Sequence, residues 1–244
     1  MAKTKKKKTE ASIEDGWKLF FKRKFDDAIA VFNRIIEEKN DQNALYGRAC
    51  AYYRTSNHEG ALTDIEALLK TDENNLDYLH TRAMIHGSNE QYEKAMKDLN
   101  KVLDIQPDNG EAWCDLGGLY LVREDFSNAR DCFERAADID KACSCAWLGK
   151  GIAALNLKEY RKANEYLNIS IKLEAKLTLA YMARAEALFL NGQKKEALKD
   201  VKKALSLDQL FFEEFKKVIG DQQENSGPED DHNDNLNEED AIVY

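Results

Sequence analysis

Residues 113–136 read WCDLGGLYLVREDFSNARDCFERA, and the rest of the chain can be understood outward from this stretch. Three residues share one face of a first predicted helix: Trp113, Gly117 and Tyr120. Three more share one face of a second predicted helix: Ala129, Phe133 and Ala136. Two helices pack closely only where one offers a very small side chain, so Gly117 and Ala129 indicate where this pair meets.

The same pattern recurs along the chain with a nearly constant period. Alanine occupies the place of Ala129 six times, at spacings of 33, 34, 34, 34 and 34 residues: Ala28, Ala61, Ala95, Ala129, Ala163 and Ala197. If this alanine is numbered position 20 of a repeat, position 8 is always very small: Gly16, Ala49, Ala83, Gly117, Gly151 and Ala185. Position 24 is always large and apolar: Phe32, Ile65, Leu99, Phe133, Leu167 and Val201. Such a period predicts stacked helix pairs, because each pair leaves an apolar face uncovered until the next one covers it.

These columns resemble the tetratricopeptide repeat, which usually has Trp, Leu, Gly, Tyr, Ala, Phe, Ala and Pro at positions 4, 7, 8, 11, 20, 24, 27 and 32. The fourth repeat matches all but the last of these, with Leu116 at position 7, and the third repeat supplies the proline as Pro107. The resemblance implies an all-α fold, a right-handed α-solenoid of six helix pairs with a C-terminal capping helix. The first repeat departs from the pattern with Ser12 and Asp15, as end repeats do, and the third has His86 at position 11.

The repeats divide most of the chain. They cover residues 9–209, in the segments 9–41, 42–75, 76–109, 110–143, 144–177 and 178–209. Residues 210–220 are predicted to form the capping helix, because five large apolar residues follow helical spacing there: Phe211, Phe212, Phe215, Val218 and Ile219. Residues 1–8, rich in lysine, and residues 221–244, rich in acids, are predicted to be disordered tails.

The net charge of −9 is unevenly placed. The first eight residues carry five lysines, whereas residues 221–244 carry nine acids and no lysine or arginine. The acidic body argues against nucleic-acid binding, which needs clustered positive charge to neutralise phosphates. We interpret the lysine run as a solvated tail, although nucleic acid, an anionic membrane or a nuclear import receptor could contact it.

The chain is expected to be cytoplasmic, with nuclear entry open to it through the lysine run. Its five cysteines lack the density of a disulfide framework and are interpreted as reduced thiols. The charged N-terminus does not resemble a signal peptide, and no apolar run is long enough to span a bilayer. Membrane insertion is therefore not expected.

In proteins that this chain resembles, the first helices line a concave groove that holds a peptide or a helix. Transferring the groove positions to this sequence gives the predicted groove residues: Ile13, Trp17, Phe20, Tyr46, Cys50, Tyr53, Asp77, His80, Met84, Cys114, Leu121, Leu148, Ile152, Leu155, Met182, Glu186 and Phe189. Most of them are apolar, and contiguous exposed apolar surface generally marks an interaction site. Aromatic residues such as Trp17 and Tyr53 anchor interfaces. The sequence therefore predicts a scaffold or adaptor that binds a protein, through an amphipathic helix or an apolar extended segment.

Three alternatives remain beside this prediction. The protein could be a co-chaperone, an assembly subunit whose groove is permanently filled, or a chain whose own apolar end, residues 241–244, occupies the groove. Chaperone-binding relatives grip a terminal carboxylate with lysine and asparagine near positions 5 and 9 of their first repeat, where this chain has Ile13 and Trp17. Because a carboxylate clamp needs cationic donors, the acidic tails of chaperones are not expected as partners.

Neither catalysis nor a cofactor is predicted. No glycine-rich phosphate loop and no nucleophile–base pair can be identified, so the chain is not expected to be an enzyme. His80 and Cys114 occupy the same position in adjacent repeats, with Met84 nearby; a soft metal accepts such ligands, but ordinary groove lining is favoured. Cys143 and Cys145 have no second pair at zinc spacing, so no metal site is predicted.

Overall fold

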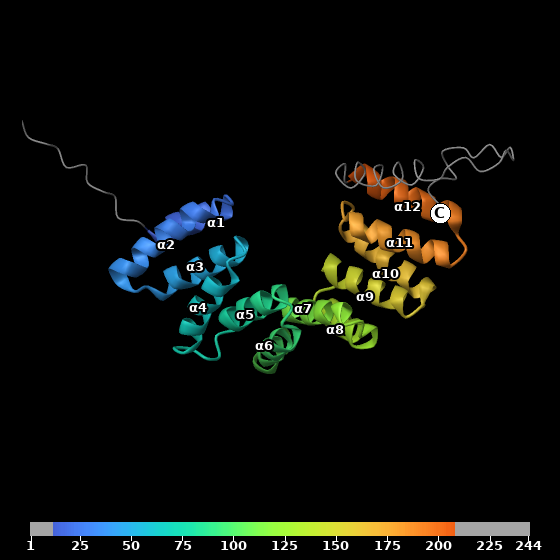
Figure 1. Ribbon diagram of the computed structural model, residues 1–244. Coiled ribbons are helices and arrows are strands. Elements are labelled where there is room, and N and C mark those ends of the chain that lie inside the picture. Colours follow the sequence, from blue (N-terminus) through green and yellow to red (C-terminus); the bar gives the residue numbers. More distant parts are fainter. Residues whose placement is uncertain (1–11, 208–244) are drawn as a thin grey trace, which may run out of the picture. The chain divides into compact units, whose positions relative to one another are not determined.

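The computed structural model describes residues 12–207, and every regular element in that range is an α-helix (Figure 1). Twelve helices follow one another: α1 (Ile13–Phe21), α2 (Phe25–Lys39), α3 (Gln42–Arg54), α4 (His58–Leu69), α5 (Leu76–Ser88), α6 (Tyr92–Ile105), α7 (Gly110–Val122), α8 (Phe126–Ile139), α9 (Ser144–Asn156), α10 (Tyr160–Leu173), α11 (Thr178–Leu190) and α12 (Lys194–Leu207). They form the six expected pairs, so the predicted all-α repeat fold is confirmed. The predicted capping helix and both predicted tails lie outside the described residues.

The helices pack as stacked pairs do. Helices adjacent in the chain contact each other from α1 to α6 and from α8 to α12, and successive first helices also meet: α1 contacts α3, α3 contacts α5, and α9 contacts α11. The chain divides within α7 into two compact units, one ending at Ala112 and the other beginning at Trp113. They are called the first unit and the second unit below, and each is described by itself.

Side chains at the helix ends explain where many of the helices begin. Asp41 precedes α3, and its carboxylate accepts hydrogen bonds from two backbone N–H groups of the first turn, at 2.8 and 3.1 Å. Asn57, Asn75 and Asp125 cap α4, α5 and α8 in the same way. Such caps satisfy N–H groups that have no partner inside the helix.

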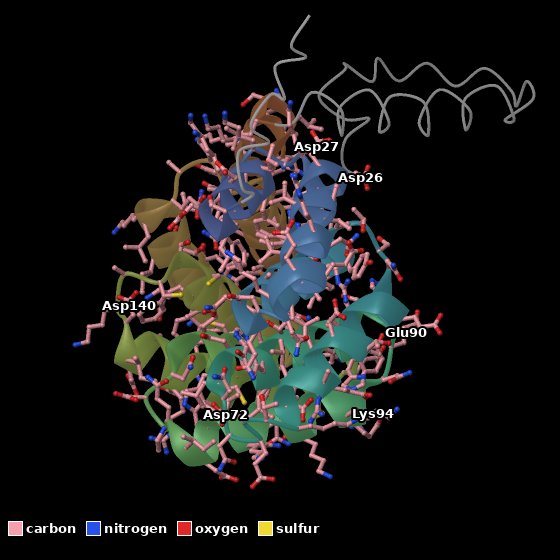
Figure 2. The ribbon with its side chains drawn as sticks, turned by 90° about the vertical axis from the view of Figure 1, so that its left-hand side faces the viewer. Asp26, Asp27, Asp72, Glu90, Lys94 and Asp140 are labelled. Carbon is pink, nitrogen blue, oxygen red and sulfur yellow. The ribbon has the colours of Figure 1, made fainter. Side chains whose placement is uncertain are left out.

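The turn inside each pair also repeats. One residue with positive φ stands at the same register in all six pairs: Arg23, Ser56, Glu90, Glu124, Lys158 and Gly192. Charged side chains of the turns and helix ends are exposed and project away from the ribbon, as those of Asp72, Glu90 and Asp140 do (Figure 2). The polar ends of the helices thus face solvent while the repeat columns face inward.

The small and large columns predicted from the sequence fit each other. Phe32 is fully buried, and a Cβ added to Gly16 or Gly47 would lie 2.4 or 2.5 Å from its ring. Gly47 belongs to the next pair, so this phenylalanine is held between two pairs. Phe133 has the same relation to two glycines, Gly117 and Gly149, with separations of 2.9 and 2.3 Å. Glycine is therefore needed on both sides wherever phenylalanine fills position 24.

A second column, not foreseen from the sequence, consists of ion pairs at position 7. Arginine from the first helix binds an aspartate of the second helix in three repeats, with N–O distances of 2.6 to 2.7 Å: Arg48–Asp64, Arg82–Asp98 and Arg184–Asp200. The three aspartates are buried, and each accepts two hydrogen bonds from its arginine. The hydrogen bond and the nearby charge of Asp98 raise the pKa of Arg82, although burial opposes this.

His86 is the one buried histidine among the described residues. It lies on α5 at 7 % exposure, and its Nδ1 lies 2.9 Å from Oε1 of Gln91. Burial lowers the pKa of His86, although the charge of Asp98 and the bond to Gln91 oppose this. The imidazole is therefore held neutral where an unfolded chain would accept a proton.

This burial predicts a pH dependence of stability. Below the ordinary histidine pKa of about 6.5, the unfolded chain binds a proton that the native chain does not bind. The free energy of unfolding therefore decreases as the pH is lowered. The loss develops between the ordinary pKa and the lowered one. We expect urea denaturation to show a smaller loss from about pH 7.5 to about pH 5.5 for His86→Phe than for the wild type. Equal losses in the two proteins would show that His86 does not couple folding to protons.

Candidate peptide-binding site

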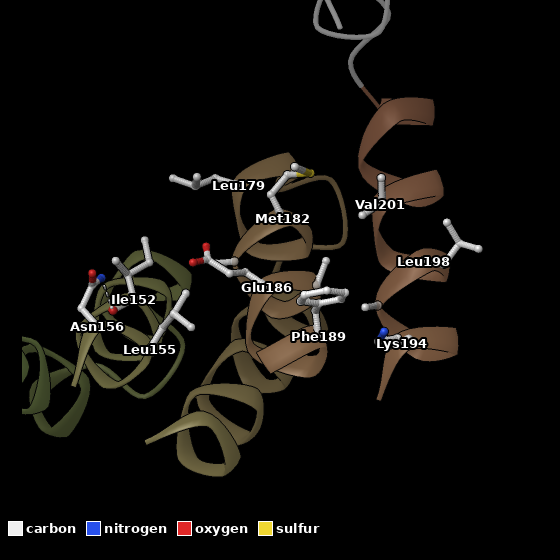
Figure 3. A pocket seen from close by; sticks show the side chains of 13 residues that line it. Ile152, Leu155, Asn156, Leu179, Met182, Glu186, Phe189, Lys194, Leu198 and Val201 are labelled. Atoms are coloured by element: carbon white, nitrogen blue, oxygen red, sulfur yellow. Dashed lines mark hydrogen bonds between the residues drawn. The ribbon is translucent and has the colours of Figure 1, made fainter. Parts of the chain in front are cut away.

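The second unit contains a pocket of about 490 Å³ between α9, α11 and α12 (Figure 3). Thirteen residues line it: Ile152, Leu155, Asn156, Leu179, Met182, Ala183, Ala185, Glu186, Phe189, Lys194, Ala197, Leu198 and Val201. Most of these side chains are apolar. The volume lies in the range of pockets that accept ligands or the side chains of a partner.

Helix geometry explains why the predicted groove residues meet here. Met182, Glu186 and Phe189 stand one turn apart on α11, so they share one face of that helix. Ile152 and Leu155 come from α9, the first helix of the preceding pair, which contacts α11. All five were predicted as groove residues and all five line the pocket.

The pocket has exposed apolar residues at its opening and a few polar groups beside them. Leu179 is 56 % exposed and Phe189 is 40 % exposed. The Lys194 ammonium lies 5.6 Å from the centre of the Phe189 ring, and Glu186 is exposed on the same face of α11. The opening therefore combines apolar anchors with one cation and one anion.

Two predicted groove residues on α9 are more deeply placed than the sequence suggested. Leu148 is 9 % exposed and Leu155 is 7 % exposed, and both belong to a hydrophobic core cluster that extends from α9 to α12. Leu155 still reaches the pocket, whereas Leu148 does not line it. Burial against the neighbouring pair leaves little of Leu148 to contact a partner.

Eight of the thirteen lining residues were not predicted as groove residues, and three of these eight are large and apolar: Leu179, Leu198 and Val201. Val201 occupies position 24, the large apolar column, which is buried in the five preceding repeats and only half-buried in the sixth. The next pair covers this column at Phe32, where Gly47 meets the ring, and at Phe133, where Gly149 does, whereas α12 is the last described helix. The sequence carried a signal for this, because it predicts six repeats and therefore no seventh repeat to cover Val201.

In the first unit, three predicted groove residues belong to an aromatic cluster: Trp17, Phe20 and Tyr46. Trp17 lies 5.3 Å from Phe20 and 6.1 Å from Tyr46, measured between ring centres. Tyr46 in turn lies 5.3 Å from Tyr78 of the next pair. Ile13 also packs beside Trp17 and Phe20 against the core around Phe32. These side chains are half-buried, so part of their surface is already used within the chain.

Hydrogen bonds also join the first helices of this unit. The hydroxyl of Tyr46 lies 3.2 Å from Thr81 Oγ1, and the hydroxyl of Tyr53 lies 3.1 Å from Ser88 Oγ. Burial raises the pKa of Tyr46 above its ordinary value and that of the Cys50 thiol to about 11. Both groups are therefore neutral at physiological pH.

The other predicted residues of α5 differ in exposure. Met84 is 42 % exposed, His80 is half-buried, and Asp77 is exposed. Met84 is therefore the apolar groove residue of this unit with the largest exposed fraction.

Cys114 and Leu121 lie on α7, and both pack against the core cluster of Ala129, Phe133 and Ala153. Cys114 has two further neighbours that the sequence did not suggest. Its Sγ lies 3.9 Å from Sγ of Cys145, which lies 3.1 Å from Sγ of Cys143. Ligand spacing read along one segment missed this group, because Cys114 and Cys145 are 31 residues apart and meet only when two pairs stack.

Comparison with known proteins follows the same repeats. A family model described as tetratricopeptide repeat matches residues 76–109 and 110–143, and a second with that description matches residues 16–75 and 146–209. No curated protein matches the sequence. Within residues 12–207, no helix has the length and apolar character needed to cross a membrane.

Solved structures of similar fold share little sequence with this chain. A tetratricopeptide repeat protein from Parabacteroides merdae is 21 % identical with a TM-score of 0.68, over 80 % of this chain and 78 % of that chain. The MamA protein is 22 % identical with a TM-score of 0.60, over 69 % and 92 %. A chain of the APC/C hetero-tetramer Cut9–Hcn1 is 16 % identical with a TM-score of 0.72, over 81 % and 40 %. At these identities the likeness concerns the fold.

Proposed function

Because the chain belongs to the tetratricopeptide repeat family, we propose that it is a non-catalytic scaffold whose second unit holds an amphipathic helix of a partner protein. The observation that carries this proposal is the apolar pocket between α9, α11 and α12. Leu179 is 56 % exposed and Phe189 is 40 % exposed, so both offer apolar surface to a partner. Exposed apolar surface around a pocket is typical of protein-binding sites.

The geometry of the lining favours a helix over an extended peptide. Met182, Glu186 and Phe189 form a ridge along α11, and the side chain of Val201 on α12 points toward it (Figure 3). Two helices that flank a groove accept a third helix, whose apolar residues then stand at i, i+3 or i+4, and i+7. The partner is therefore expected to carry three or four large apolar residues at that spacing.

The two charges at the opening of the pocket favour one orientation of the bound helix. Glu186 favours a lysine or arginine beside the partner's apolar stripe, and Lys194 favours an aspartate or glutamate. Both groups are exposed or near solvent, so they contribute little to affinity and are screened by salt. The affinity of the partner should therefore change little between low and physiological salt.

A peptide-display selection tests the proposal on the full chain. We expect selected peptides to share the apolar helical spacing, and Phe189→Ala to weaken their binding by about 2 kcal/mol, or roughly 30-fold, as loss of an aromatic anchor does. Titration calorimetry or fluorescence anisotropy measures the change. Circular dichroism should show that the variant keeps its helices, because Phe189 is partly exposed.

Phe21→Ala is the matched control, because Phe21 is an exposed phenylalanine, at 77 %, on a first helix of the other unit. It should leave peptide affinity unchanged. If Phe21→Ala weakens binding and Phe189→Ala does not, the site lies on the aromatic cluster of the first unit. If the peptides bind the wild type, Phe189→Ala and Phe21→Ala with equal affinity, neither surface is the binding site.

The apolar stripe predicted within residues 210–220 is a rival occupant, because it follows α12 directly in the chain. A chain ending at Leu207 separates the two cases. Equal peptide affinity for the full and the shortened chain indicates that the pocket is open to a partner. Binding that requires the shortening indicates that the chain's own end competes for it.

A further inference from the structure

Three cysteine sulfurs gather in the second unit. The Sγ atoms of Cys114, Cys143 and Cys145 all lie within 4.8 Å of one another. Cys145 is exposed and the other two are half-buried, so the group can be reached from solvent. Among the described residues, no histidine or carboxylate joins the three sulfurs within that distance. The group is called the thiol cluster below.

Two stacked pairs bring these thiols together. Cys143 is the residue that precedes α9, and Cys145 stands in the first turn of that helix. Cys114 comes from α7, the first helix of the preceding pair. The positive end of the α9 dipole therefore lies beside two of the sulfurs, where it would stabilise the negative charge of thiolates that bind a cation.

The start of α9 is fixed by contacts that do not involve the sulfurs. The indole Nε1 of Trp147 donates to the carbonyl of Lys141 at 3.0 Å. The buried hydroxyl of Ser170 donates to the carbonyl of Ser144 at 3.0 Å, which ties the helix start to α10. The two sulfurs of α9 are thus held by a braced segment, as ligands of a bound ion need to be.

We propose that Cys114, Cys143 and Cys145 bind one thiophilic d10 metal ion, copper(I) or zinc(II), through three thiolates. A metal–sulfur bond of about 2.3 Å places two thiolates on one ion about 3.8–4.0 Å apart. The sulfurs lie 3.1 and 3.9 Å apart in the two measured pairs and within 4.8 Å overall, so small side-chain rotations suffice. Each ligating thiol releases its proton to solvent, and neither the metal nor the sulfur changes oxidation state.

The surroundings of Cys114 and Cys145 favour the protonated thiol. Burial, followed by the neighbouring thiols, raises the pKa of Cys114, and burial likewise raises that of Cys145. Protonated thiols carry no charge, so they do not repel one another before a cation displaces their protons. Soft sulfur ligands select copper(I) or zinc over magnesium or calcium. Three sulfurs suit three-coordinate copper(I) directly, whereas zinc(II) needs a water as its fourth ligand.

The test is metal binding by the reduced full chain under anaerobic conditions. Copper(I) and zinc(II) are added separately and competed with chromophoric chelators, and thiolate-to-metal charge-transfer absorption reports sulfur ligation. We expect one ion per chain, with copper(I) held more tightly than zinc(II). Cobalt(II) serves as the optical probe of the zinc geometry.

Variants assign the binding to the cluster. Cys143→Ser keeps a good helix cap, because serine is a preferred residue before a helix, so it removes a soft ligand without weakening α9. It should lower metal affinity by more than about tenfold, the loss already caused by removing outer-shell partners. Cys114→Ser should do the same. Cys50→Ser, in the first unit, is the control and should bind as the wild type does.

The outcomes are distinct. Tight copper(I) binding that both cluster variants lose supports a three-coordinate site, and zinc(II) binding lost in the same variants supports a site completed by water. Absence of binding, or binding that the cluster variants retain to the same extent as Cys50→Ser, overturns the proposal. None of these results depends on the peptide site of α9, α11 and α12.

Discussion

Arg82→Leu is expected to lower the free energy of unfolding by about 3–5 kcal/mol, because it leaves a buried carboxylate without its cation. Asp98 is 4 % exposed and accepts two hydrogen bonds from Arg82, both of 2.7 Å. Because the Asp98 carboxylate is buried, water cannot replace the two hydrogen bonds that Arg82 donates to it. Urea denaturation followed by circular dichroism measures the change.

The fourth repeat indicates which residues can replace the ion pair without loss of stability. The fourth repeat has Leu116 and Cys132 where the third has Arg82 and Asp98, and both of these apolar residues are buried. Arg82→Leu combined with Asp98→Cys should therefore recover most of the loss, since apolar replacement of a buried ion pair is often neutral or stabilising. If the double variant is as unstable as the single one, the unpaired carboxylate is not the cause.

Arg34→Leu is the control for charge removal alone. Arg34 and Glu38 form an exposed pair at 3.5 Å on α2, with side chains 38 % and 48 % accessible. Exposed pairs contribute about 0–1 kcal/mol, so this change should be close to neutral. A loss equal to that of Arg82→Leu would mean that net charge, not burial, governs the effect.

Phe32→Ala is expected to cost about 3–5 kcal/mol, the range for removing a buried aromatic side chain. The ring is fully buried between Gly16 of its own pair and Gly47 of the next pair. Its loss leaves a cavity that glycine, having no side chain, cannot fill from either side. Denaturation in urea at fixed pH measures the change.

The glycines give the complementary experiment. A Cβ at Gly47 would lie 2.5 Å from the ring, so Gly47→Ala should cost about 1–3 kcal/mol through overpacking. Adding Phe32→Leu should recover part of that loss, because leucine fills the same column at Leu99 and Leu167. A double variant less stable than the sum of the two single changes would contradict this packing. Gly118→Ala is the control: nothing lies within 4 Å of its added Cβ, so it should stabilise α7 by about 0.5–1 kcal/mol.

Sequence periodicity was sufficient to predict the helices and their pairing. The alanine at position 20 and the small residue at position 8 have one physical cause, the close approach of two helices, and they therefore recur in every pair. The same reasoning predicted that Met182, Glu186 and Phe189 share a face, since residues one turn apart must do so. It did not predict the ion pairs. The family usually has leucine at position 7, and an arginine at that position meets its aspartate sixteen residues later, on the second helix of the pair.

The sequence by itself therefore determined the fold, the register of the repeats and the membership of each helix face, because these depend on local spacing. Only the tertiary structure decided which of those faces remain open. Leu148 became core, Val201 lined a pocket, and Cys114 met Cys143 and Cys145. The reason is that burial and contact between pairs depend on how two helices thirty or more residues apart in the chain pack together. The spacing of residues within one helix does not predict that packing.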